Sequence, residues 1–122
     1  MDKTLKIYTD GSIATVALDF DDYQAIRKEI GGYFETVRTR RMEDYFEQQV
    51  VMLVDDDGFR KNLPMNPVAS LFYGSAISGN YIVGDILLAV QMGEDIVAPS
   101  QEEFGRWREM LKRDFYLQER IG

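Results

Sequence analysis

Apolar stretches of two kinds predict the strands of this chain. Residues 5–9 alternate apolar and polar side chains, Asp10-Gly11 is a typical two-residue turn, and residues 13–18 follow as the returning strand of an N-terminal hairpin. Residues 33–38 alternate in the same way. Residues 49–54 and 86–90 are almost continuously apolar, which predicts two central strands with both faces buried.

The first helix is predicted over residues 21–30. Apolar residues recur there at spacings of three and four, which places them on one face of a helix. Asp19 or Asp21 is expected to cap it, with Asp22 in the first turn, where a negative charge meets the positive end of the helix dipole. Gly31-Gly32 is expected to end it, because glycine accepts the left-handed conformation of a helix stop.

Two further helices are marked by their N-terminal residues. Asn66 is a good cap and Pro67 suits a first helical position, so a short helix is predicted to start there and to stop at Gly74. Ser100 and Glu103 have the spacing of a capping box, and an aromatic stripe follows them. This predicts a C-terminal helix over residues 101–115, within a terminal segment of residues 99–118.

The remaining segments are expected to be irregular. Residues 40–47 form a charged connector, residues 55–58 a solvated turn, and residues 74–80 a loop of small side chains. The resulting fold class is α+β, with an antiparallel or mixed sheet of about five strands, two main helices and one short helix. A length of 122 residues predicts a single domain, residues 1–122.

The composition narrows the chemistry of the chain. It has no histidine and no cysteine, which removes the usual proton shuttle near neutral pH, the best thiolate nucleophile and the commonest zinc ligands. The serines lie in no nucleophile-elbow motif, and the acidic run at residues 55–57 lacks the alternating ligands of a calcium loop. We therefore expect no catalytic residue, no metal site and no cofactor, and a protein that is not an enzyme.

The charge and the N-terminus indicate where such a protein acts. The net charge of −7 disfavours direct binding to nucleic acid or to anionic lipid, both of which need a basic face. The first residues have no apolar segment typical of a signal peptide, and no stretch approaches the roughly 20 apolar residues of a membrane span. The expected location is the cytoplasm.

A few residues have side chains suited to holding a ligand. Tyr33 and Tyr73 lie beside glycines, Asn66 lies in a loop-rich region that also contains Tyr81, and Arg38 begins a basic run. Aromatic faces and amides can hold a nucleobase or a peptide, and an arginine can hold an anion. The alternative is structural: tyrosines half-buried at the rim of the sheet, asparagines in caps and turns, and an arginine at a solvated strand end.

A succession of short motifs resembles a known family. The motifs are Gly31-Gly32-Tyr33-Phe34, Val54-Asp55-Asp56-Asp57-Gly58, Leu63-Pro64-Met65-Asn66-Pro67 and Ile82-Val83-Gly84-Asp85. In this order they resemble the family named domain of unknown function 3846, over a core of residues 31–90. The residues that match its pattern are Gly32, Asn66, Gly84 and Asp85, and Asp85 therefore joins the candidate ligand residues. The helix after Pro99 is expected to lie outside the shared pattern.

What the resemblance implies is biological context. Such proteins occur in phages, plasmids and conjugative elements of bacteria, with no assigned activity. The leading hypothesis is a small binding protein of a mobile element that contacts a host or element-encoded protein, as a monomer or a homodimer. The alternatives are a domain that binds a small, nucleotide-like molecule and an acidic protein that imitates DNA.

Overall fold

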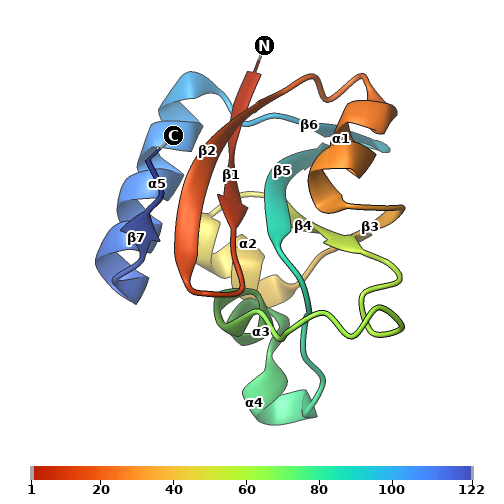
Figure 1. Cartoon of the computed structure of the whole chain (residues 1–122). Coiled ribbons are helices and arrows are strands. Elements are labelled where there is room, and N and C mark those ends of the chain that lie inside the picture. The colour runs from red at the N-terminus through yellow and green to blue at the C-terminus, as the bar shows by residue number, and fades with distance from the viewer. Residues whose placement is uncertain (1, 122) are drawn as a thin grey trace.

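One mixed β-sheet runs through the molecule (Figure 1), which is described over residues 2–121 in a computed structural model. The strands are β1 (Asp2–Ile7), β2 (Ser12–Leu18), β3 (Phe34–Val37), β4 (Val50–Asp55), β5 (Ile86–Met92), β6 (Asp95–Val97) and β7 (Gln118–Glu119). Their order in the sheet is β3-β4-β5-β1-β2-β7, and β6 pairs with the last residues of β5, on the same side of β5 as β1. Every pairing is antiparallel except that of β2 with β7, which is parallel.

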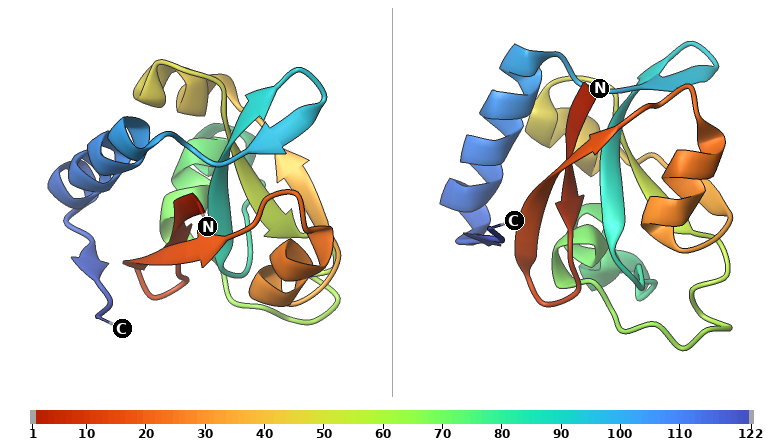
Figure 2. Two further views of the ribbon diagram at one scale, coloured as in Figure 1. Left: turned by 90° about the horizontal axis from the view of Figure 1, so that it is seen from above. Right: turned by 45° about the horizontal axis from the view of Figure 1, so that its top comes forward.

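Helices cover both faces of the sheet (Figure 2). The helices are α1 (Tyr23–Ile30), α2 (Arg40–Phe46), α3 (Pro67–Tyr73), α4 (Ser75–Ser78) and α5 (Gln101–Phe115). One face carries α1, and the other carries α2, α3 and α5, while α4 extends from the end of α3 (Figure 1).

Two hydrophobic cores result from this layering. In the buried strand β4, Val50 and Met52 face the larger core beneath α2, α3 and α5, whereas Val51 and Leu53 face the smaller core beneath α1. Trp107 of α5 is fully buried in the larger core. Both central strands therefore have two buried faces, as their continuous apolar pattern predicts.

Several sequence predictions are confirmed. The class is α+β and the sheet is mixed. The N-terminal hairpin pairs in register from Asp2 opposite Leu18 to Ile7 opposite Ile13. Helix α5 has the predicted bounds and both hydrogen bonds of the capping box. Asn66 caps α3, and Gly74 ends it.

Other sequence predictions are wrong. Residues 40–46 form α2 instead of a connector, because Thr39 caps them and Met42 and Phe46 are buried one turn apart. Asp22, not Asp19 or Asp21, caps α1. Part of the expected small-residue loop is α4, and the strands β6 and β7 bring the sheet to seven instead of about five.

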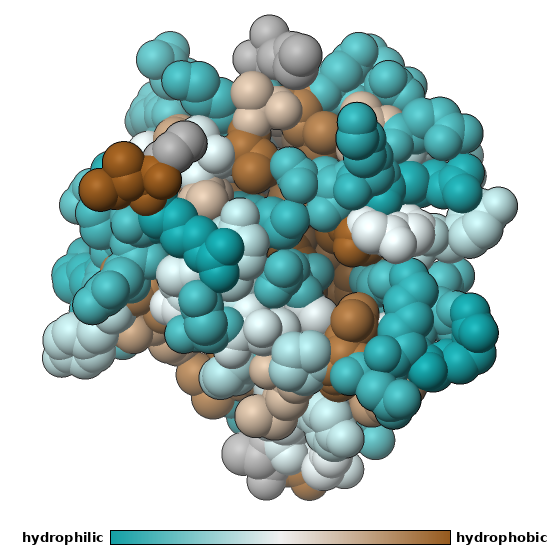
Figure 3. All heavy atoms as spheres, in the orientation of Figure 1, coloured by the Kyte–Doolittle hydropathy of each residue, from teal (hydrophilic) through white to brown (hydrophobic). Residues whose placement is uncertain are grey.

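The surface is mostly polar on the face shown in Figure 3, where apolar residues form small separated patches. Among the described residues, no helix combines the length and the apolar character that crossing a membrane requires.

Candidate functional site

The five residues that the sequence marks for ligand binding do not converge on one site. Asn66 is fully buried; its side-chain amide donates to the carbonyls of Ile7 and Gly84, at 3.0 Å each, and its oxygen accepts from Ala69. Asp85 accepts from the backbone N–H of Thr9 at 3.0 Å. Both side chains therefore connect segments of the fold instead of facing a ligand.

The other three of these residues lie at the surface in different surroundings. Tyr33 is 66% exposed, and the Arg27 guanidinium lies 3.8 Å from its ring centre. Arg38 forms an exposed ion pair of 3.4 Å with Glu43. Of these three residues, only Tyr73 lines a surface hollow that other aromatic residues also line. The five residues therefore do not form one site, and among them only Tyr73 lies on the hollow that Phe59 and Tyr81 also line.

Phe59 and Tyr81 form an exposed aromatic pair, here called the aromatic ridge. Their ring centres lie 5.4 Å apart in an edge-to-face arrangement. Phe59 is 62% exposed and Tyr81 is 42% exposed, although each comes from a loop that is anchored to the sheet. Exposed aromatic groups held in this way are typical of binding surfaces, because aromatic residues supply much of the affinity of protein interfaces.

A hollow lies on each side of the ridge, and both ridge residues line both hollows. The first has a volume of about 410 Å³ and is bordered by β3 and by the end of the α3–α4 segment, with Glu35, Val37, Tyr73 and Asn80 among its lining residues. The second has a volume of about 390 Å³ and is lined by Asn62, Leu63, Met65 and Val83. Volumes of this order fit one or two side chains or a small ligand.

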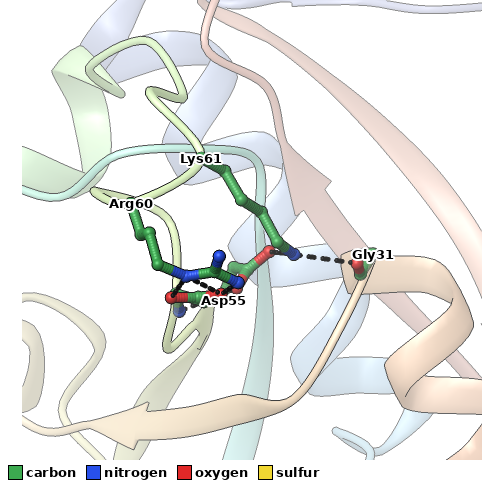
Figure 4. A network of polar contacts seen from close by, with 5 residues as sticks. Gly31, Asp55, Arg60 and Lys61 are labelled. Atoms are coloured by element: carbon green, nitrogen blue, oxygen red, sulfur yellow. Dashed lines mark hydrogen bonds and ion pairs between the residues drawn. The ribbon is translucent and has the colours of Figure 1, made fainter.

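A polar clamp holds the loop that carries Phe59. The Lys61 ammonium group donates to the Asp55 carboxylate at 2.7 Å and to the Gly31 carbonyl at 3.1 Å (Figure 4). The side chain of Asp55 is 2% exposed, so this aspartate is buried and paired, not part of the solvated turn that the sequence predicts. A side chain at residue 32 would collide with the lysine, since its Cβ would lie 2.7 Å from the Lys61 nitrogen.

The same loop is held from its other end by Gly84. Its backbone N–H donates to the Pro64 carbonyl at 2.8 Å, its φ is +83°, and a Cβ there would lie 2.9 Å from Leu63. The residues that carry the family resemblance, Gly32, Asn66, Gly84 and Asp85, therefore all support the segments around the ridge. Asn66 and Asp85 do so through side-chain hydrogen bonds, and none of the four residues lines the two hollows.

The charges around the ridge are mostly negative or neutralised in pairs. Asp57 forms an ion pair with Arg60, and hydrogen bonds from that guanidinium hold the pKa of Asp57 below its usual value. Glu35 is an exposed acid on the first hollow, and no cationic side chain lines either hollow within the described residues. The site is therefore suited to apolar and basic groups, and it offers no counter-charge to a phosphate.

Comparison with known proteins places the chain in a family. The sequence profile described as "Domain of unknown function (DUF3846)" matches residues 3–112. The chain belongs to this family. No curated protein and no solved structure matches it. The match is wider than the expected core of residues 31–90 and includes most of α5, so the prediction that this helix lies outside the shared pattern is wrong.

The sequence marks one of the two ridge residues. Tyr81 stands out because it neighbours a glycine-rich loop, as does Tyr73, which lines the first hollow. Phe59 stands among acidic and basic residues of an apparent turn, where periodicity gives no signal. The one signal for Phe59 in the sequence is that it is a large apolar residue, between Gly58 and Arg60, in a segment that is otherwise polar.

Proposed function

We propose that this member of the family is a binding protein that contacts another protein through the aromatic ridge. The observation that supports this most strongly is the exposure of Phe59 and Tyr81 between two hollows on loops held by buried polar contacts. Keeping such a surface fixed and exposed lowers the ordering cost of an encounter with a partner. The expected partner is a host or mobile-element protein.

The geometry also suggests what the partner presents. Two apolar side chains placed on either side of the ridge would fill the two hollows, and a basic side chain would complement Glu35. An overall charge of −7 attracts such a basic partner over a longer range.

The test is capture of partners from a bacterial lysate with matched variants of the whole chain. The ridge variant F59S/Y81S is compared with the wild type and with the control Y23S/Y116S, which removes two exposed aromatic residues elsewhere. A protein held by the wild type and the control and lost with the ridge variant, with at least about a tenfold weaker Kd when purified, supports the proposal. Equal binding by all three forms contradicts it.

A small molecule is the second candidate occupant, because the hollows have a volume typical of ligand sites. A thermal-shift screen tests this candidate, because a small molecule present at 100 times its Kd stabilises the folded protein by about 2.7 kcal/mol. The absence of a cationic lining residue among the described residues argues against a nucleotide there. We rank an acidic DNA mimic last, because several acids, such as Asp55, Asp57 and Glu119, are paired with cations.

A further inference from the structure

One edge of the sheet borders the first hollow. Strand β3 is the last strand on that side of the sheet, and it pairs with β4 (Figure 2). Val37 packs against the larger core and Phe34 against the smaller one, so Glu35 and Val37 share the face of β3 on which the first hollow lies. Within residues 2–121, no strand pairs with the outer side of β3. The first hollow therefore adjoins a strand edge without a neighbour in this part of the chain.

The outward backbone groups of this edge belong to Phe34 and Thr36. The carbonyl of Tyr33 accepts from the N–H of Asp56 at 3.1 Å, and the register of β3 with β4, continued by one pair, places these two residues directly opposite each other. The backbone groups of Tyr33 therefore point toward the β4 side. Because this direction alternates along a strand, those of Glu35 also point toward β4, and those of Phe34 and Thr36 point outward. Each of these two residues presents one N–H and one carbonyl group to a further strand.

These backbone groups distinguish between two kinds of partner. A helix uses its own backbone groups internally, so a helix that lies across β3 would cover the outward groups of Phe34 and Thr36 without pairing them. Covering polar groups in this way weakens binding, because they lose their hydrogen bonds to water. An extended segment pairs all of these groups and places every second side chain on the face of the first hollow. The edge therefore favours an extended segment over a helix.

The charges around the edge favour a basic residue in that segment. Glu35 is exposed and lines the first hollow. Two cations of neighbouring segments are already paired, Arg38 with Glu43 and Arg60 with Asp57. The carboxylate of Glu35 is therefore available to a cation from another molecule, and a lysine or arginine directly opposite it on an added strand would lie close enough to attract it.

We propose that the partner of the aromatic ridge contributes an extended segment that pairs antiparallel with β3, an inference that rests on the function proposed above. Two residues of the segment exchange hydrogen bonds with Phe34 and Thr36. The residue between them is basic and faces Glu35 in a non-hydrogen-bonded pair, where opposite side chains are closest. The residue two positions before the basic one faces Val37 and is apolar, since its side chain lies beside the first hollow. The partner segment therefore has the signature apolar-x-basic.

The probe for this proposal is a library of random short peptides, displayed on phage and selected on the whole wild-type chain. Selected peptides are synthesised, and their Kd is measured with the purified wild type and with variants. They should share the apolar-x-basic signature. T36P removes an outward N–H and leaves the β4 ladder intact, so it should weaken binding by at least about tenfold in Kd, whereas T36V keeps this N–H and should not.

Changes in the peptide test the pairing while the protein stays unchanged. N-methylation of the peptide residue opposite Thr36 removes an N–H that bonds to β3 and should weaken binding by at least about tenfold. N-methylation of the basic residue, whose N–H points away from β3, should leave the Kd within about twofold. E35K should weaken binding of the basic peptide by about fivefold, and a peptide with glutamate in place of the basic residue should recover this loss on E35K.

The ridge variant F59S/Y81S separates the failure of this proposal from the failure of the proposed function. Peptides that lose binding with the ridge variant, but bind T36P and tolerate either N-methylation, would overturn the strand pairing and leave the ridge as the binding surface. Peptides that T36P and the N-methylation opposite Thr36 weaken, but the ridge variant does not, would support the pairing and contradict the ridge. A selection that yields no peptide specific for the chain contradicts both.

Discussion

The side chain of Asn66 connects three parts of this fold. The side chain caps α3 and donates to carbonyls of β1's last residue and of the segment before β5, so three parts of the chain meet at one amide. The sequence predicts the cap from the Asn-Pro pair. It cannot predict the two donated bonds, because their acceptors are backbone atoms brought close only by the tertiary fold.

Replacement of Asn66 by alanine is expected to destabilise the protein by about 2–4 kcal/mol, since it removes the cap and leaves two buried carbonyls without a donor. N66S, which can keep the cap but not the amide donors, should recover only about 1 kcal/mol of this. The measurement is urea unfolding, with N80A at an exposed asparagine as the control. A loss for N66A no larger than for N80A would show that the amide has no structural role.

Helix boundaries were predictable where a cap and an apolar stripe occur together. Helix α5 has both, and its predicted bounds are confirmed. The sequence does not predict helix α2, because charged side chains separate its cap, Thr39, from its buried residues. Its apolar stripe, Met42 and Phe46, is also only one turn long. Helix α4 and strand β7 are too short for any periodicity to show, and their positions depend on tertiary contacts.

The capping box of α5 makes the stability of this helix depend on pH. The Ser100 N–H donates to the Glu103 carboxylate at 2.8 Å, and this bond lowers the pKa of Glu103 from its usual 4.5. The folded pKa is therefore below the unfolded one, so the stabilisation is complete above about pH 5.5 and is lost as the pH falls through the folded pKa.

The E103Q variant should therefore lose about 0.5–1 kcal/mol of stability at pH 7 and show a smaller decrease between pH 6 and pH 3 than the wild type. Thermal or urea unfolding at a series of pH values measures both effects. E102Q makes the same charge change on an exposed residue of the same turn and is the matched control. If the two variants have the same pH profile, the capping box is not the source of the dependence.

At the scale of the whole molecule, the rigid and the accessible parts are separated. β4 and β5 lie centrally in the sheet and are buried on both faces for most of their length. Helix α4 extends away from these layers (Figure 1), and the aromatic ridge lies on the loops that follow β4 and α4. The central strands could be predicted from their continuous apolar pattern, whereas the ridge could not, because it results from two loops far apart in sequence that meet only in the fold.

This separation predicts an order of amide hydrogen exchange. The amides of Val51, Leu53 and Leu88 should exchange only through global unfolding and should be the slowest in the protein, because their strands have neighbours on both sides and no exposed face. Those of α4 should be among the fastest, since the helix is only four residues long and its Ile77 and Ser78 are exposed.

The loop that carries Phe59 is expected between these limits, because Lys61 ties it to Asp55 and Gly31. K61A should speed exchange over residues 57–63 by at least about tenfold while leaving β4 and β5 unchanged, since it opens the loop and not the core. R60A, which removes an exposed ion pair of the same loop, is the control. Equal effects of the two variants would mean that the clamp does not hold the loop, and the ridge would then have to become ordered on meeting its partner.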